Sequence, residues 1–430
     1  MLQAVANAFK LPDLRRRILF TIGILVIFRF VAHIPVPGVD LVRLRNAFSS
    51  NQLLGMLDLF SGGAMSNFSV AAMGVYPYIT ASIIMQLLVP IIPRLEEIAK
   101  EGEAGRNRIN RYTHWLTVPL AALQALGQIS LLQNQFQVVS SFGLFNKETW
   151  FPSLAMVITM TAGTVFCVWL GELITESGIG NGVSIIIFGG IVARSPQSFG
   201  QSLFVNVSII GLLVFLLIEL ITVAGIVVVQ QGERSIPVQY AKRIRGTRMY
   251  GGQSTHIPLK VNSAGMIPLI FASSMLIFPG VVASYFLYPQ GTVVANFAKV
   301  IYDFFNRQNL GYQSLYFLLV LGFTYFYTTV IFQQQNLSEN LQKWGGFVPG
   351  IRPGRPTAEY LNRVLNRMTL VGAVFLGVVA VLPYFTRLAT NVQTMQISST
   401  GILIVVGVVL DTMKQLEAQL LMRHYEGFIK

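Results

Sequence analysis

The sequence predicts an all-α polytopic membrane protein with ten transmembrane helices, arranged as two inverted five-helix halves around a shared seam. The first observation is composition: 53% of the 430 residues are hydrophobic and 11% are charged, whereas a soluble domain usually carries about 25% charged residues. The second is a set of ten long apolar runs, since a bilayer core requires about 20 largely apolar residues per helix. The third is a nine-residue pattern that occurs twice.

The repeated pattern is Gly-x-x-Pro-x-Ile-x-Ala-Ser, and both copies lie inside apolar runs. The copies are Gly74-Val-Tyr-Pro77-Tyr-Ile79-Thr-Ala81-Ser82 and Gly265-Met-Ile-Pro268-Leu-Ile270-Phe-Ala272-Ser273. Their separation is nearly half of the chain, which indicates two related halves. Membrane proteins with such repeats place their working site at the repeat interface. The alternative is coincidence, because Gly and Pro are common in membrane helices.

The first span follows a basic segment, Lys10 and Arg15–Arg17, and so resembles a signal peptide. No small-x-small cleavage site follows, and Arg29 and Pro35 interrupt the end of the apolar run. We therefore expect an uncleaved first span. The ten predicted spans cover approximately residues 18–36, 72–92, 114–132, 152–172, 182–197, 207–230, 262–288, 312–334, 368–386 and 397–418.

The distribution of Lys and Arg predicts the orientation. Alternate loops and the two termini carry 23 of these residues, and the opposite loops carry 7, so both termini are expected on the cytoplasmic side. The motif copies fall on the second and seventh spans. Because five spans is an odd number, the halves, predicted as residues 1–200 and 201–430, should be inverted relative to each other.

Residues 53–69 are apolar but too short to cross a bilayer. Gly62 and Gly63 would weaken a helix there. Irregular backbone survives at membrane depth only when it is buried in protein or lines a cavity. We therefore expect a re-entrant piece that folds into the helix bundle immediately before the first motif copy. The alternative is a loop lying on the membrane surface.

A narrow apolar collar is the predicted feature of the seam. Val75 and Ile79 share a helix face because they are four residues apart. Val183 and Ile187 form the same pair on the fifth span, and Ile270 is the second-copy equivalent of Ile79. Such side chains aimed at a common axis would exclude water and ions by dewetting. The alternative is that they face lipid or core, as most Val and Ile on membrane helices do.

Few ionisable residues lie inside the spans: Arg29 near the outer part of the first, and Glu219 near the middle of the sixth. A charge at mid-membrane costs roughly 2.5–3.5 kcal/mol on insertion scales. Glu219 is therefore protonated, directed into a water-filled cavity, or farther from the middle of the bilayer than the predicted span limits place it. A proton-coupling role is a further alternative, and with it a secondary transporter.

Catalytic signatures are missing from the sequence. The four histidines show no His-Glu-x-x-His pattern, and no Gly-x-Ser-x-Gly or Walker motif is present. Gly178-Ile-Gly180-Asn-Gly182 is best interpreted as a tight turn into the fifth span. The sequence thus predicts no enzyme, no metal site and no cofactor.

Two long loops predicted to be cytoplasmic, residues 231–261 and 335–366, are basic and contain stiff Pro and Gly turns. Their length and rigidity favour docking of a large cytoplasmic partner, since such basic surfaces suit RNA or acidic proteins. The alternative is that they only set the membrane topology.

Several motifs in a fixed order resemble the SecY family of protein-conducting channels, and its bacterial branch closely. They are Phe28-Arg29 with Ile34-Pro35-Val-Pro37-Gly38-Val-Asp40; Phe60-Ser61-Gly62-Gly63-Ala64; Glu101-Gly-Glu-Ala-Gly-Arg106; Trp169-Leu-Gly-Glu172-Leu-Ile-Thr-Glu176; Gln253-Ser-Thr-His256-Ile-Pro-Leu-Lys260-Val-Asn262; and Pro349-Gly-Ile-Arg352-Pro353-Gly354.

The resemblance implies a passive central pore that moves unfolded polypeptides across the bacterial cytoplasmic membrane and releases transmembrane segments sideways into lipid. It implies a gate formed by spans two and three against seven and eight, and a short re-entrant plug helix that seals the resting pore. The plug residues would be Phe60, Ser61, Gly62, Gly63 and Ala64. The pore ring would be Val75, Ile79, Val183, Ile187, Ile270 and Ile404.

The resemblance also implies partners. These are the small membrane subunits SecE and SecG, the SecA ATPase motor, the ribosome with its RNA, signal peptides, unfolded precursor polypeptides and membrane lipid. The docking residues would be Arg243, Arg245, Arg248, Arg352 and Arg355. Glu219 belongs to none of the family's motifs.

Overall fold

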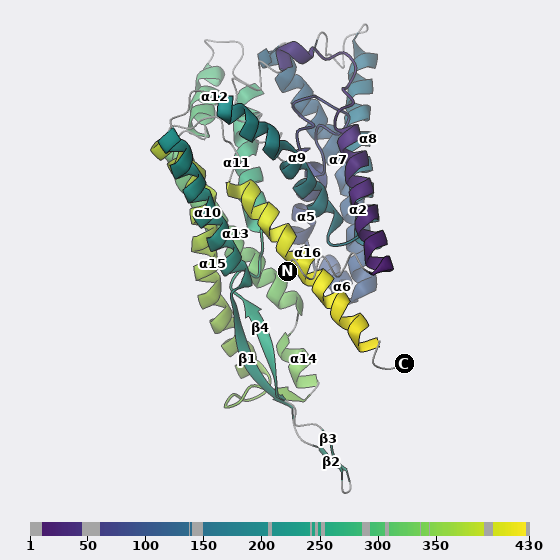
Figure 1. Ribbon diagram of the computed structural model, residues 1–430, viewed down its shortest axis with the longest axis vertical. Coiled ribbons are helices and arrows are strands. Elements are labelled where there is room, and N and C mark those ends of the chain that lie inside the picture. Colours follow the sequence, from purple (N-terminus) through teal and green to yellow (C-terminus); the bar gives the residue numbers. More distant parts are fainter. Residues whose placement is uncertain are drawn as a thin grey trace. The chain divides into compact units, whose positions relative to one another are not determined.

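The computed structural model describes residues 11–44, 61–136, 138–139, 149–204, 209–240, 243–245, 248–250, 254–285, 293–305, 309–335, 337–343, 345–390 and 399–426. Each of the ten predicted spans coincides with a helix (Figure 1). In order, these helices are α2 (Pro12–Val31), α5 (Tyr76–Leu88), α7 (Glu103–Phe136), α8 (Trp150–Ser177), α9 (Gly182–Phe204), α10 (Ile209–Gln231), α11 (Ile267–Tyr285), α13 (Leu310–Gln335), α15 (Arg355–Thr390) and α16 (Ser399–Glu426).

Length and composition support a polytopic membrane protein. Among the described residues, four helices (α8, α10, α13 and α15) are each long and apolar enough to cross a bilayer. The pair α5 and α6 (Pro93–Lys100) would make a fifth span, with a bend of 99° between them. Two further helices are short and apolar over residues 182–193 and 267–276. The predicted all-α polytopic class is confirmed.

The second span begins later than predicted. The sequence places its start near residue 72, whereas α5 begins at Tyr76. Gly74 takes a left-handed backbone conformation (φ 54°), which an α-helix cannot contain. The chain from residue 62 to residue 75 therefore runs as turns, and most of it is buried.

Two compact units make up the chain. One consists of residues 1–207, 277–307 and 393–430, and the other of residues 208–276 and 308–392. The first unit contains all of the predicted first half and three segments of the second, residues 201–207, 277–307 and 393–430. Segments that pack together need not be repeats of each other. The two repeat halves, residues 1–200 and 201–430, therefore stay a prediction.

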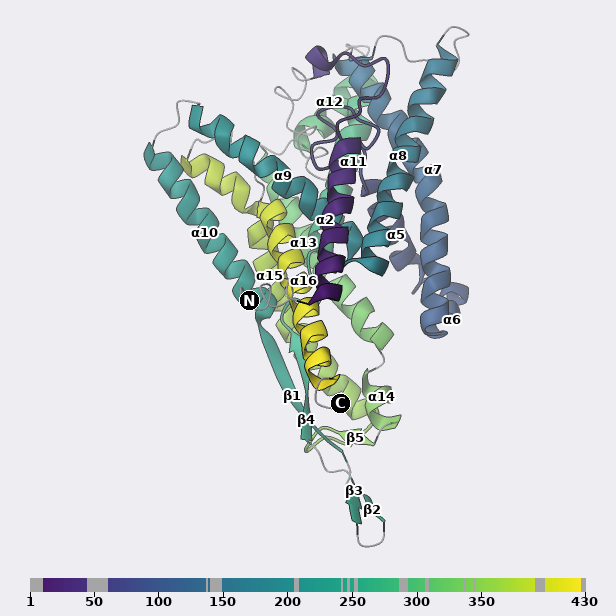
Figure 2. The same cartoon turned by 45° about the vertical axis from the view of Figure 1, so that its right-hand side comes forward.

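The first unit has its core between α7, α8 and the irregular chain before α5. Buried side chains from these segments include Met65, Phe68, Ile129, Leu132 and Met160. In both ribbon views α7 and α8 run side by side (Figure 2). The short helix α12 (Val293–Phe304) also belongs to this unit.

The second unit combines α10, α13, α14 (Leu337–Lys343) and α15 with a small sheet. Strand β1 (Glu233–Tyr240) pairs antiparallel with β4 (Ser254–Lys260) in the register Glu233 to Lys260, and its other edge pairs with β5 (Gly346–Phe347). Strands β2 (Arg243–Arg245) and β3 (Arg248–Tyr250) form a separate hairpin at the far end of β1 and β4 (Figure 1).

The sheet gives the two predicted docking loops a common core. Ile236 and Val238 of β1 and Leu259 of β4 are buried against Leu341 and Leu361. The alternation of buried and exposed residues along β1 is the pattern of a strand with one covered face. The sequence interpretation of these segments as loops missed this alternation.

Candidate functional site

The repeated motif adopts the same backbone conformation in both copies. Gly74 and Gly265 both have positive φ, 54° and 64°. In each copy a helix begins two residues later, and the motif proline, Pro77 or Pro268, is the second helical residue. Proline is tolerated there because the N–H that it lacks would have no partner within the helix. The motif is therefore a device that starts a helix abruptly within an apolar region.

The hydrogen bonding after this start also recurs. The N–H of Ile79 donates to the carbonyl of Val75 at 3.1 Å, and the N–H of Ile270 donates to the carbonyl of Met266 at 3.4 Å. The motif alanines, Ala81 and Ala272, are both 0% exposed, so each copy turns its small residue inward. The sequence repeat is thus also a repeat of local structure.

The segment before the first copy is a tight turn inside the first unit. Gly62 and Gly63 have φ of 66° and 86°, so residues 62–68 form turns. Ser61 and Ala64 are 1% and 0% exposed, and the Ser61 hydroxyl accepts a 3.0 Å hydrogen bond from the N–H of Met65. Four of the five predicted plug residues therefore lie in a buried segment. Phe60, the fifth, lies outside the described residues.

Gly62 is in backbone contact with α9. A Cβ atom built at Gly62 would lie 2.5 Å from the Cα of Gly190, and one built at Gly190 would lie 2.5 Å from the Cα of Gly62. Any side chain on either residue would force the two segments apart. The ring of Phe28 on α2, 1% exposed, approaches Gly62 from another direction.

Arg29 on α2 contacts the same residue. Its Nη1 donates a hydrogen bond of 2.7 Å to the carbonyl of Gly62. The arginine is half-buried near the end of α2, one residue after Phe28. The sequence interpretation noted Arg29 only as an interruption of an apolar run, because no periodicity links residues 33 positions apart.

The predicted pore-ring residues occupy the beginnings of helices and the interior of α16. Val75 precedes α5, Ile79 lies in its first turn, and Val183 and Ile187 lie in the first two turns of α9. Ile404 is on α16, which packs against α9. Val75, Ile187 and Ile404 are buried, whereas Ile79 and Val183 are partly buried.

Val183 and Ile270 are two predicted ring residues whose surroundings differ. Val183 lies against α8, where a Cβ built at Gly171 would lie 3.2 Å from its Cγ2. Ile270, 5% exposed, lies in the first turn of α11 and belongs to the second unit. A ring that joins all six side chains stays a prediction.

The predicted docking arginines divide between two turns of the second unit. Arg243, Arg245 and Arg248 lie on the β2–β3 hairpin, where Arg245 pairs directly with Arg248 across the strands.

The other two arginines lie near the start of α15. Arg352 is exposed, in a turn between Gly350 (φ 81°) and Gly354 (φ 99°), and its own carbonyl accepts a hydrogen bond of 2.8 Å from Thr357. Within the described residues it forms no ion pair. Arg355 does, through Nε to Glu359 Oε1 at 3.2 Å.

Comparison with known proteins now decides the family. A protein-family model described as SecY matches residues 69–413. The protein translocase subunit SecY of Halalkalibacterium halodurans is 47% identical, with all of both chains aligned. That of Thermotoga maritima is 45% identical over all of this chain and 98% of its own. The chain belongs to the SecY family.

Solved structures agree on the fold. A protein-conducting channel superposes with a TM-score of 0.62 at 16% identity, covering 96% of each chain. A SecY structure in which the plug domain stabilises the closed state and maintains a membrane seal gives 0.61 at 17% identity, and Sec61 of the canine ribosome–channel complex gives 0.60 at 16%. As a SecY-family member, the chain is a protein-conducting channel subunit of a membrane.

Glu219 is the carboxylate predicted near the middle of the sixth span. It lies in α10, whose residues Leu213, Leu217 and Leu220 are each at least 60% exposed. Its Oε2 is buried and has no hydrogen-bond partner among the described residues.

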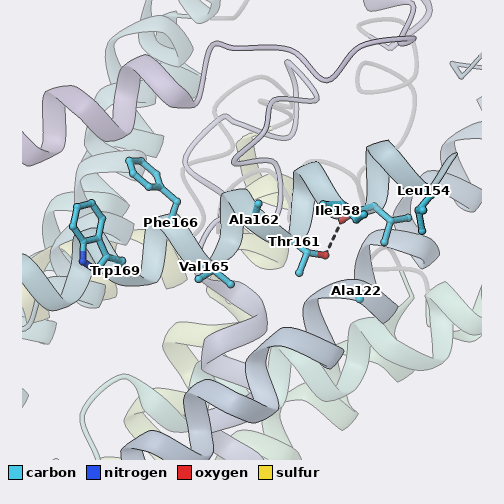
Figure 3. A pocket seen from close by; sticks show the side chains of 9 residues that line it. Ala122, Leu154, Ile158, Thr161, Ala162, Val165, Phe166 and Trp169 are labelled. Atoms are coloured by element: carbon cyan, nitrogen blue, oxygen red, sulfur yellow. Dashed lines mark hydrogen bonds between the residues drawn. The ribbon is translucent and has the colours of Figure 1, made fainter. Parts of the chain in front are cut away.

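An apolar groove of about 690 Å³ runs along α8 beside α7 (Figure 3). The hydroxyl of Thr161 within it donates to the carbonyl of Val157 at 2.7 Å. The groove therefore offers hydrocarbon contact but no free acid, base or nucleophile from its lining. The remaining lining residues are Ala122, Leu154, Ile158, Ala162, Val165, Phe166 and Trp169.

Proposed function

We propose that this SecY-family chain is a conduit, closed at rest, that passes unfolded polypeptides through a bacterial cytoplasmic membrane and performs no chemistry of its own. The observation that carries the proposal is the buried glycine turn at residues 61–64, which contacts α2 and α9 and precedes the first motif copy at Gly74. Non-helical backbone at membrane depth has to be enclosed by protein. A short buried turn can leave its place more readily than a packed helix, because fewer backbone hydrogen bonds hold it.

The seal has two proposed parts. The plug is the segment Ser61–Ala64, by analogy with the SecY whose plug domain maintains a membrane seal. The collar is the predicted ring of Val75, Ile79, Val183, Ile187, Ile270 and Ile404. Apolar constrictions close to water and ions by dewetting, so a collar would limit leakage while a polypeptide passes. Spans two and three against seven and eight form the proposed lateral gate.

Orientation and partners follow from charge. The 23-to-7 bias of Lys and Arg supports both termini in the cytoplasm. The basic hairpin and the Arg352 turn then project on the side of the ribosome and the motor. The canine Sec61 relative was solved with a ribosome, which supports a ribosomal partner here. SecA, SecE and SecG are proposed partners on the family resemblance.

The collar is tested by Ile79→Gly combined with Ile270→Gly. Ion conductance of the resting channel in planar bilayers should rise, because two stiff apolar side chains are lost from the constriction. The matched control is Ile158→Gly with Ile221→Gly, one exposed isoleucine from each unit, which should leave the conductance unchanged. Equal conductance for both double variants would show that the collar is wrong.

A further inference from the structure

We propose that Arg29 is a positioning residue that holds the channel closed, by donating a charged hydrogen bond to the carbonyl of Gly62. The proposal rests on the proposed function, in which residues 61–64 seal the pore. It adds a specific restraint on that seal, located on α2 rather than in the collar or the plug itself.

Arg29 places a positive charge in an apolar stretch of α2. Arg29 stands among apolar residues of α2, between Phe28 at 1% exposure and Phe30 at 70%. An arginine within a membrane span is costly, and such residues commonly mark a functional contact. Among the described residues no carboxylate lies within ion-pair distance of Arg29. Its hydrogen-bond partner is the backbone oxygen of Gly62 at 2.7 Å.

Three restraints meet at Gly62. Gly62 receives the hydrogen bond from Arg29, contacts the backbone of Gly190, and has a φ of 66° that favours glycine. Displacing this single residue breaks the contacts with α2 and α9 together. A hydrogen bond to Gly62 therefore helps to keep the whole turn in its closed position.

The acceptor of the Arg29 hydrogen bond is an uncharged backbone carbonyl. A hydrogen bond from a guanidinium to a carbonyl is stronger than a bond between neutral groups, yet it leaves no buried anion behind when it breaks. Water entering the vacated space can solvate the freed guanidinium. The contact is therefore strong enough to favour closure and reversible enough to permit opening. An ion pair at this depth would leave two charges to solvate.

Three substitutions at Arg29 separate charge from shape. Arg29→Met removes the donor, Arg29→Gln keeps a neutral donor, and Arg29→Lys keeps a charged one. The open fraction of resting channels in planar bilayers should rise roughly ten-fold for Met, less for Gln, and least for Lys. Arg16→Met, at an exposed position on the same helix, is the matched control and should behave as the unmodified chain. If Met and Gln both match the control, the proposal is wrong.

A labelling experiment follows the turn directly. Ser66→Cys is placed in a Cys167→Ser background, and its reaction with a membrane-impermeant maleimide is timed in the assembled complex. Arg29→Met should accelerate labelling about ten-fold, whereas a purely structural role for Arg29 would leave the rate unchanged. If the Met variant fails to accumulate, Arg29→Gln decides, because it changes the charge while keeping a polar side chain.

Deletion of residues 61–66 distinguishes the two proposals. If the deletion leaves the resting channel closed, the proposed seal fails, and the restraint fails with it. If the deletion opens the channel but the Arg29 variants do not, only the restraint by Arg29 fails. If both open it, both proposals are supported.

Discussion

At the scale of single residues, close packing in this channel depends on positions that have no side chain. Gly163 on α8 lies against the carbonyl of Val70, and Gly182 at the start of α9 lies against the carbonyl of Gly171. Small residues allow membrane helices to approach closely, so that dispersion contacts replace the missing hydrophobic drive. The contact between Gly62 and Gly190 belongs to this set, although it joins a turn to a helix.

Gly62→Ala should raise the resting ion conductance. The added methyl would meet the Cα of Gly190 at 2.5 Å, and alanine is strained at a φ of 66°. Overpacking of this kind costs about 1–3 kcal/mol, which the turn can relieve by leaving its place. Conductance in planar bilayers measures the effect.

The control for this prediction is Gly23→Ala on α2, where an added Cβ has nothing within 4 Å. This substitution should leave the conductance unchanged and stabilise the helix by up to ~1 kcal/mol. Equal conductance for Gly62→Ala and Gly23→Ala would contradict a sealing role for Gly62.

Some residue relationships in this chain can be predicted from the sequence, and others cannot. The equivalence of Ile79 and Ile270 could be predicted, because it follows from the alignment of two copies of one motif. The contact of Arg29 with Gly62 could not, since its acceptor is a backbone atom and any residue supplies one. Sequence patterns record side-chain identities and spacings, whereas this contact depends on where the turn folds back.

At the scale of elements, local properties were predicted well. All ten spans coincide with helices, because the length of an apolar run is a property of consecutive residues. The β1–β4 sheet was missed, although Ile236 and Val238 alternate with polar residues or proline. In a membrane protein the apolar runs dominate the signal, and two apolar residues within a basic segment are easily interpreted as loop.

Val238→Asp should unfold the sheet while leaving the membrane helices intact. Val238 is 0% exposed within the sheet core, and an unpaired buried carboxylate costs about 3 kcal/mol or more. Limited proteolysis should then cleave between residues 233 and 260 at least ten times faster. Gln239→Asp, an exposed neighbour, should retain the original rate. Undiminished resistance of Val238→Asp would show that the sheet does not depend on this core.

Arg352→Gln should weaken ribosome or motor binding by about five-fold or more, which corresponds to ~1 kcal/mol. Its guanidinium is exposed and forms no ion pair within the described residues, so its charge is available to an anionic partner. Arg355→Gln should have a smaller effect, because Arg355 already pairs with Glu359 at 3.2 Å. Sedimentation binding at two salt concentrations measures both, since exposed charge contacts weaken with salt. An equal loss for both variants would argue against the special role of Arg352.

At the scale of the whole molecule, sequence repetition and compactness divide the chain differently. The motif copies predict one half at residues 1–200 and the other at residues 201–430, whereas the first compact unit also includes residues 201–207, 277–307 and 393–430 of the predicted second half. An inverted repeat describes how the chain is related to itself. A compact unit describes which segments pack together. The proposed lateral gate rests on the predicted halves, which divide the chain differently from the compact units.

If both motif copies line one seam, then Ile79→Cys and Ile270→Cys should cross-link in a Cys167→Ser background. A short bis-maleimide added to the resting complex should join them, because a shared seam would bring these two first-turn positions close together. A precursor arrested in the channel should block the reaction by occupying the seam. Ile158→Cys with Ile270→Cys is the control pair, since Ile158 is 58% exposed on α8, and it should not cross-link. If the two pairs give the same yield while each single cysteine remains reactive, the shared seam is disproved, although each motif would still start its own helix.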